Sequence, residues 1–167
     1  MPQQDLKPIP SVEDDTIYAT KERKKKIPQQ DLKPILLVED DTIDAMAVKK
    51  AFEYLHIRNK LAVVTNGEEA LEYLKDKNNA KPQIILLDLN MPRMNGIEFM
   101  KIAKADDRMK RIPVVILTTS KAEQDRVITF GLGAAGYIMK PVDHGDFIKM
   151  MDKIHQYWEM TLFPDSY

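Results

Sequence analysis

Cysteine is absent from this 167-residue sequence, and its absence excludes disulfide bonds, metal sites built on thiolates and redox chemistry at sulfur. A chain without cysteine fits a reducing compartment. Histidine is scarce as well, because the chain has only His56, His144 and His155. These three show none of the spacings typical of metal ligands, and we assign them no role.

Long apolar runs are also lacking. The longest spans a few residues, whereas crossing a bilayer takes about 20, and the first residues show no charged-then-apolar signal pattern. Charge of one sign is not in excess, since 25 basic and 26 acidic residues give a net charge of −1. No global field then attracts nucleic acid or anionic lipid. We therefore expect a cytoplasmic protein that binds neither nucleic acid nor membrane.

The N-terminal part contains a near repeat. Residues 2–9 read PQQDLKPI, and residues 28–35 read the same. The first copy continues into Pro10, which would remove a hydrogen-bond donor from a central strand, and a basic run follows at 21–26. We interpret residues 1–33 as a duplicated, basic and flexible segment. A nucleic-acid contact at the basic run is a weaker alternative, since the overall charge does not favour it.

From residue 34 onward, short apolar runs alternate with segments of helical period. The runs rich in Val, Ile and Leu predict strands over 34–38, 60–64, 83–88, 112–118 and 135–139. The intervening segments predict helices over 42–55, 66–76, 96–105, 121–131 and 143–159. Continuous apolar strands are typical of parallel sheets that are covered on both faces. The sequence therefore predicts an α/β fold with a five-stranded parallel sheet and helices on both sides.

Local signals agree with these boundaries. Thr42 and the Asn66-Gly67 pair stand where helices are expected to begin, and Pro113 stands at the start of a strand, where a missing donor is tolerated. We assign residues 34–155 to one domain and residues 156–167 to an aromatic C-terminal tail.

Functional side chains follow four of the predicted strands. Glu39 and Asp40 follow the first, Asp88 the third, Thr118 the fourth and Lys140 the fifth. In open parallel sheets, ligands bind beyond the carboxyl ends of the strands. Gathered carboxylates repel one another unless a cation compensates, and Mg²⁺ is the hard, oxygen-seeking candidate. An aspartate beside Mg²⁺ and a lysine can act as nucleophile toward a phosphoryl group.

The motifs LLVEDD, LLDLNMPRMNG, LTTS and GYIMKP occur in this order between Ile35 and about Ile154. In order and spacing they resemble the receiver domains of two-component response regulators. The resemblance implies a flavodoxin-like, doubly wound (βα)5 sheet with strand order 2-1-3-4-5. The C-terminal YWEMTLFP further resembles the small response regulators paired with phytochrome-type kinases, which dimerise through a face built by the last helices and strand.

The resemblance also implies a role for each site residue. Asp88 accepts a phosphoryl group from a sensor histidine kinase, and Lys140 contacts that group. Glu39 and Asp40 form the acidic pair, and the backbone carbonyl of Asn90 joins Asp40 and Asp88 around Mg²⁺. Thr118 moves to hydrogen-bond the phosphoryl group, and Tyr137 turns inward as the switch aromatic. Phosphorylation is then expected to shift the 121–159 face for partner binding or homodimer formation.

Several alternatives remain beside this interpretation. Only 27 residues follow Lys140, too few for a DNA-reading or catalytic output domain, so we expect a stand-alone receiver rather than an enzyme. An aspartyl-phosphate phosphatase or mutase would need a second general acid where Asn90 stands. A pseudo-receiver that binds partners without phosphorylation is disfavoured by four intact residues, Asp40, Asp88, Thr118 and Lys140. Each site residue alone also has a structural reading, such as a helix cap for Asp40 or Asp41.

Overall fold

The computed structural model describes residues 32–161. Five strands and five helices alternate along the chain. The strands are β1 (Ile35–Val38), β2 (Leu61–Val64), β3 (Ile84–Leu87), β4 (Val114–Thr118) and β5 (Gly136–Met139). The helices are α1 (Thr42–Tyr54), α2 (Gly67–Lys75), α3 (Gly96–Ala105), α4 (Glu123–Gly131) and α5 (His144–Met160). The first copy of the repeat and the basic run lie outside the described residues.

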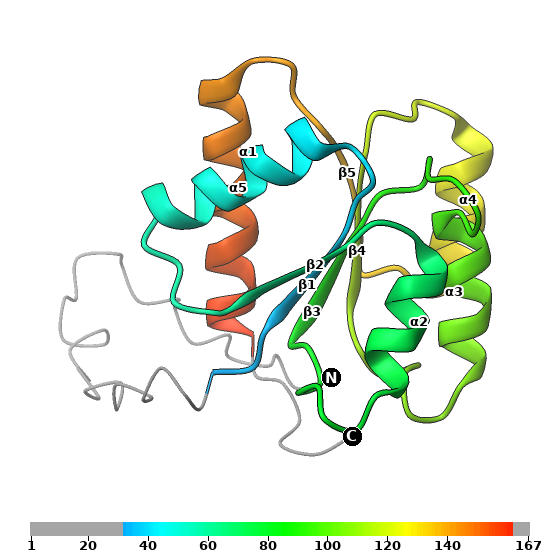
Figure 1. The fold of residues 1–167 in the computed structure, drawn as a ribbon. Coiled ribbons are helices and arrows are strands. Elements are labelled where there is room, and N and C mark those ends of the chain that lie inside the picture. Colours follow the sequence, from blue (N-terminus) through cyan, green and yellow to red (C-terminus); the bar gives the residue numbers. More distant parts are fainter. Residues whose placement is uncertain (1–31, 162–167) are drawn as a thin grey trace, which may run out of the picture.

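All five strands are parallel and pair in the order β2-β1-β3-β4-β5, which confirms the predicted doubly wound sheet. The chain moves outward from β1 in one direction and then returns to build the other side of the sheet. Helices α1 and α5 cover one face, and α2, α3 and α4 cover the other (Figure 1). The carboxyl ends of β1, β3, β4 and β5 consequently meet at one edge.

The core consists of two apolar layers, one on each face of the sheet. Alternate residues of β1 and β3 point into different layers, so that Leu37 and Leu86 join α1 and α5 while Leu36 and Leu87 join α2 and α3. Every residue of these two strands is buried. Burial on both faces explains why the strands read as continuous apolar runs.

Of the two helix caps predicted from the sequence, one is confirmed and one is wrong. The side chain of Asn66 accepts a hydrogen bond from the backbone N–H of Glu69 at the start of α2. Thr42 is not a cap, because Asp41 occupies the N-cap of α1 and its side chain accepts from the backbone N–H groups of Ile43 and Asp44. Aspartate is the stronger cap of the two because its charge also complements the helix dipole.

The C-terminal helix, α5, continues past residue 155, where the sequence analysis ended the domain. Residues 156–160 were assigned to a tail but belong to α5, where Trp158 is buried against Phe52 of α1 with ring centroids 6.1 Å apart. Residues 162–167 lie outside the described residues.

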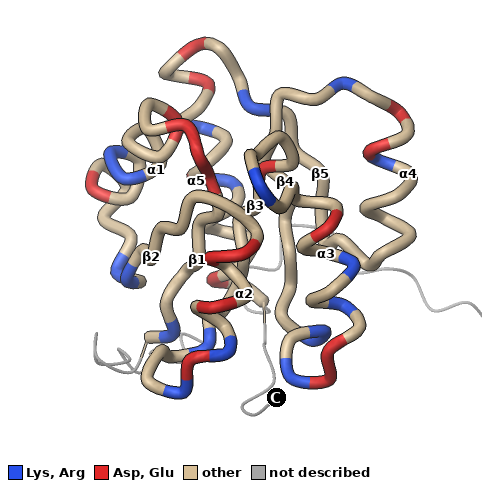
Figure 2. Tube along the Cα trace, turned by 45° about the vertical axis from the view of Figure 1, so that its right-hand side comes forward, with Lys and Arg blue, Asp and Glu red and all other residues tan. Residues whose placement is uncertain are grey.

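No helix in the described part of the chain combines the length and the apolar character needed to cross a membrane. Basic and acidic residues are interspersed along α1 and α3 (Figure 2).

Candidate functional site

Four predicted site residues meet at the carboxyl edge of the sheet because their strands run in register. Val38 lies opposite Leu87, and Thr118 lies opposite Met139. Glu39, Asp88 and Lys140 each stand one residue beyond their strand, and Thr118 is the last residue of β4. The backbone N–H of Asp88 donates to the Val38 carbonyl at 3.0 Å, which extends the ladder to the aspartate itself.

The loop that carries Asp88 depends on a glycine. A Cβ at Gly96 would lie 2.4 Å from the carbonyl oxygen of Asp88, so only glycine lets α3 start this close to β3. Asn95 and Glu98 then form a capping box at the start of α3. The loop is therefore closed tightly, and Asp88 is held at the edge with 7% of its surface exposed.

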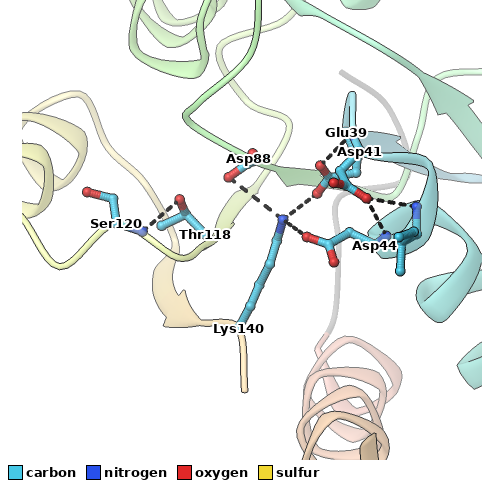
Figure 3. A network of polar contacts seen from close by, with 8 residues as sticks. Glu39, Asp41, Asp44, Asp88, Thr118, Ser120 and Lys140 are labelled. Atoms are coloured by element: carbon cyan, nitrogen blue, oxygen red, sulfur yellow. Dashed lines mark hydrogen bonds and ion pairs between the residues drawn. The ribbon is translucent and has the colours of Figure 1, made fainter. Parts of the chain in front are cut away.

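Lys140 occupies the centre of the site (Figure 3). Its Nζ donates to Oε2 of Glu39 at 2.5 Å and to Oδ2 of Asp44 at 2.7 Å, and lies 3.9 Å from Oδ1 of Asp88. The backbone N–H of Lys140 donates to the Thr118 carbonyl at 2.9 Å, which fixes where the side chain starts. The ammonium thus neutralises part of the charge of three carboxylates from three segments.

Burial shapes the protonation of the Glu39–Lys140 pair. Burial raises the pKa of Glu39 to about 7, a rise that the Lys140 hydrogen bond and charge reduce and the Asp88 charge increases. Burial alone would lower the pKa of Lys140, but its hydrogen bonds to Asp44 and Glu39 outweigh burial, and the pKa is raised. Burial therefore disfavours the ionised form of Glu39, and a bound cation would stabilise that form.

The donor set fits a hard divalent cation. Glu39, Asp40 and Asp88 each offer a carboxylate oxygen, and these atoms all lie within 4.8 Å of one another. Carboxylate oxygens in this number suit Mg²⁺ or Mn²⁺. Asp40 and Asn90 are exposed, so water can complete the coordination that Mg²⁺ prefers. Asn90 lies two residues after Asp88 in the same loop and lines a cavity of about 350 Å³ with Asn95 and Asp125.

Thr118 and Tyr137 connect this edge to α4. The Thr118 side chain is fully buried, and its hydroxyl accepts from the backbone N–H of Ser120 at 3.2 Å. Tyr137 is half-buried against the apolar layer on that face, and its hydroxyl donates to the Ser120 carbonyl at 2.9 Å. The Ser120 hydroxyl donates to Asp125 of α4 at 2.6 Å. Both predicted switch residues therefore contact the same loop.

Sequence reasoning missed two functional contacts. Asp44 was not singled out, although it stands in the first turn of the helix that directly follows Glu39 and Asp40. Ser120, the partner of Tyr137 and Asp125, belongs to the LTTS motif but was assigned no role, because its contacts depend on the path of the β4–α4 loop.

The family model of the response regulator receiver domain matches residues 35–152. The chain belongs to this family. A curated relative, the response regulator Rcp1 of Synechocystis, is 35% identical over 123 residues, which is 71% of this chain and 84% of the relative. A probable methanogenesis regulatory protein, FilR2 of Methanothrix harundinacea, is 34% identical over 117 residues, 68% of this chain and 76% of the relative.

Solved structures place this receiver domain near phytochrome response regulators. The phosphorylated cyanobacterial phytochrome response regulator RcpA superposes with a TM-score of 0.76 at 32% identity, covering 80% of this chain and 99% of that one. The Mn²⁺-bound form of Rcp1 gives 0.74 at 35% identity, covering 79% and 99%. A metal-bound and a phosphorylated relative thus share the fold that assembles the carboxylates here.

Proposed function

We propose that this receiver domain accepts a phosphoryl group on Asp88 from a sensor histidine kinase. The observation that carries the proposal is the placement of Lys140 3.9 Å from a buried Asp88, with further carboxylates beside it. A carboxylate oxygen of Asp88 attacks the phosphorus of a phosphohistidine and forms a P–O bond. The P–N bond breaks, and the imidazole nitrogen keeps the electron pair. The product is an aspartyl phosphate.

Asp40, Asp88 and the Asn90 carbonyl would hold Mg²⁺, with Glu39 adding negative charge, and the ion would supply positive charge to the phosphoryl oxygens. The Lys140 ammonium neutralises developing charge on the same group, as a preorganised donor does. The Thr118 hydroxyl exchanges its contact with the Ser120 N–H for a phosphoryl oxygen. The domain is the acceptor of this transfer and not a multiple-turnover enzyme, since Asn90 stands where a phosphatase would place a second acid.

Phosphorylation is proposed to act on the 121–159 face through the β4–α4 loop. When the Thr118 hydroxyl turns to the phosphoryl group it releases the Ser120 N–H, and Ser120 also contacts Tyr137 and Asp125. The loop and α4 then shift together, and Tyr137, which is already packed into the apolar layer, follows the loop through its hydrogen bond to the Ser120 carbonyl. Such a switch is a population shift between two packings of one loop and one helix.

The same face is proposed to form a homodimer after activation. Exposed apolar side chains come from all three of its elements and from the loop before α5: Val127, Ile128 and Phe130 of α4, Met139 of β5, Val142, and Tyr157 and Met160 of α5. Such residues gather at protein interfaces. The protein is proposed to be cytoplasmic and its kinase to be phytochrome-type, which is supported by the similarity to the phytochrome response regulator RcpA.

The dimer is tested by light scattering with and without beryllofluoride, which mimics a phosphoryl group on a carboxylate. We expect beryllofluoride to double the mass of the wild type but not of Phe130→Glu. Ile102→Glu is the matched control, because Ile102 is also exposed but lies on α3. A dimer that survives Phe130→Glu and is lost in Ile102→Glu would place the interface elsewhere.

Phosphorylation is tested by intact mass after incubation with acetyl phosphate and Mg²⁺. We expect one phosphoryl adduct on the wild type, and none on Asp88→Asn or after chelation of the metal. Asp76→Asn serves as a matched control, since Asp76 is an exposed acid at the end of α2. No adduct on folded wild-type protein would contradict the proposal and favour a pseudo-receiver that binds partners without phosphorylation.

A further inference from the structure

Lys140 makes its two short contacts with Glu39 and Asp44, not with Asp88. The Asp44 contact is 2.7 Å long, whereas Asp88 lies beyond hydrogen-bond distance at 3.9 Å. Asp44 comes from the first turn of α1 and is not among the proposed metal ligands. An ammonium has three N–H donors, and two of them are engaged before any phosphoryl group is present.

We infer that Asp44 is a positioning residue that competes with phosphorylated Asp88 for Lys140 and so limits how much of the protein is phosphorylated. The inference rests on the proposed phosphorylation of Asp88. It assigns to Asp44 a regulatory role that acts through the lysine, without contact with the phosphoryl group.

Burial decides which contact the lysine gives up. The side chain of Glu39 is 2% exposed and that of Asp44 is 38% exposed. A carboxylate that loses its partner while buried pays a large desolvation cost, whereas a partly exposed one is rehydrated by water. Lys140 therefore keeps Glu39 and releases Asp44 when it turns to the phosphoryl oxygens.

Charge acts in the same direction. Phosphorylation adds negative charge at Asp88, and the carboxylate of Asp44 lowers the net positive charge that Lys140 presents to it. Removal of the Asp44 charge thus frees the lysine and lessens repulsion at once. A merely structural role predicts the opposite, because a weakened start of α1 would loosen the site and reduce binding.

The test compares the affinity of beryllofluoride for the wild type, Asp44→Asn and Asp107→Asn at saturating Mg²⁺, followed by ¹⁹F NMR. Asp107 is the matched control, because it also pairs with a lysine, Lys110 at 2.5 Å, but lies before β4 at the opposite edge. We expect roughly tenfold tighter binding in Asp44→Asn, the equivalent of one charge-assisted hydrogen bond exchanged, and no change in Asp107→Asn. Unchanged or weaker binding in Asp44→Asn would overturn the inference.

A double-mutant cycle with Lys140→Met shows whether the effect runs through the lysine. We expect Asp44→Asn to leave affinity nearly unchanged once Lys140 is replaced. An equal gain in both backgrounds would mean that Asp44 acts as a bulk charge, and the inference would be wrong.

Chemical labelling of Lys140, which needs neither metal nor phosphate, measures directly how strongly Asp44 holds the lysine. The rate at which acetic anhydride labels the Lys140 amine should rise in Asp44→Asn, while labelling of Lys104, which donates to backbone carbonyls, stays constant. Equal labelling of Lys140 in both proteins would show that Asp44 does not hold it. Wild type that binds no beryllofluoride would defeat the proposed function itself, whereas normal wild-type binding with no gain in Asp44→Asn would defeat only the inference.

Discussion

The half of the domain around β1 and β3 is packed far more tightly than the half around α4 and β5. Every residue of β1 and β3 is buried, and α1 buries four side chains. By contrast, α4 buries only Thr129, none of β5 is fully buried, and Phe130 is 55% exposed. Sparse burial lowers the free energy of local opening. The acidic residues thus stand on the tightly packed half, whereas Lys140 reaches them from the end of β5, and the proposed response occurs where rearrangement costs least.

The largest predicted effect is on the stability of the tightly packed half. Leu86→Ala removes a fully buried side chain of β3 and should lower the free energy of unfolding by about 2–5 kcal/mol. Phe130→Ala on α4 removes an exposed ring and should change it by only about 0.5 kcal/mol. Denaturant unfolding measures both. Similar losses in the two variants would mean that the halves are equally packed.

The second prediction concerns pH and follows from burial on the packed side. With the pKa of Glu39 raised to about 7, this carboxyl carries a proton below that pH and must lose it before a cation binds. The affinity for Mg²⁺ should therefore rise by up to about tenfold per pH unit below about 7 and level off above it. Calorimetric titration across this range measures the slope. Glu39→Gln should flatten it, and a slope that persists in this variant would assign the proton to another group.

The third prediction concerns the hydrogen bond from the Tyr137 hydroxyl of β5 to the β4–α4 loop. Tyr137→Phe removes the hydroxyl that donates to Ser120 and should cost about 0.5–1.5 kcal/mol while speeding hydrogen exchange at residues 119–122. Tyr73→Phe is the matched control, because its hydroxyl makes a longer 3.4 Å contact with the Ala80 carbonyl. Unchanged exchange in Tyr137→Phe would show that the tyrosine does not hold the loop.

The smallest predicted effect concerns the start of α4, in the loosely packed half. The N-cap of α4 is Ala122, whose side chain cannot cap, whereas Asp41 caps α1 with two hydrogen bonds. Ala122→Asp should raise the free energy of unfolding by about 0.5–1 kcal/mol, and Asp41→Ala should lower it by about 1 kcal/mol. Thermal unfolding of both variants provides the measurement. No gain from Ala122→Asp would mean that the Ser120 hydroxyl already satisfies this helix start.

Much of the fold was predictable because buried parallel strands leave a plain pattern in the chain. The runs ending at Val38, Leu87 and Thr118 placed three strand ends within one residue of their positions. The strand order was not derivable from such runs and came from the family resemblance. The sequence predicted Thr42 as the cap of α1, whereas Asp41 caps it. Four acidic residues lie between 39 and 44, and the sequence does not show which of them caps the helix and which faces the site.

The predicted site residues were recognisable because they stand at or just beyond the ends of strands, but their partners were not. Lys140 was expected to face Asp88, but its contact with Asp44 is shorter than its contact with Asp88. The Asp44 contact depends on where the first turn of α1 lies relative to the edge of the sheet. The Tyr137–Ser120 hydrogen bond depends likewise on a loop path. Contacts made by side chains across different segments leave no periodic signal, so only the folded chain reveals them.

The most direct test of the account is hydrogen–deuterium exchange with and without Mg²⁺ and beryllofluoride. If chemistry on the rigid half drives a response on the loose half, exchange should change in residues 119–131 and 136–142, while 35–38 and 84–87 stay protected in both states. Thr118→Ala should bind beryllofluoride yet lose most of the distant change. Uniform protection across the domain, or a change confined to the binding loops, would contradict the account.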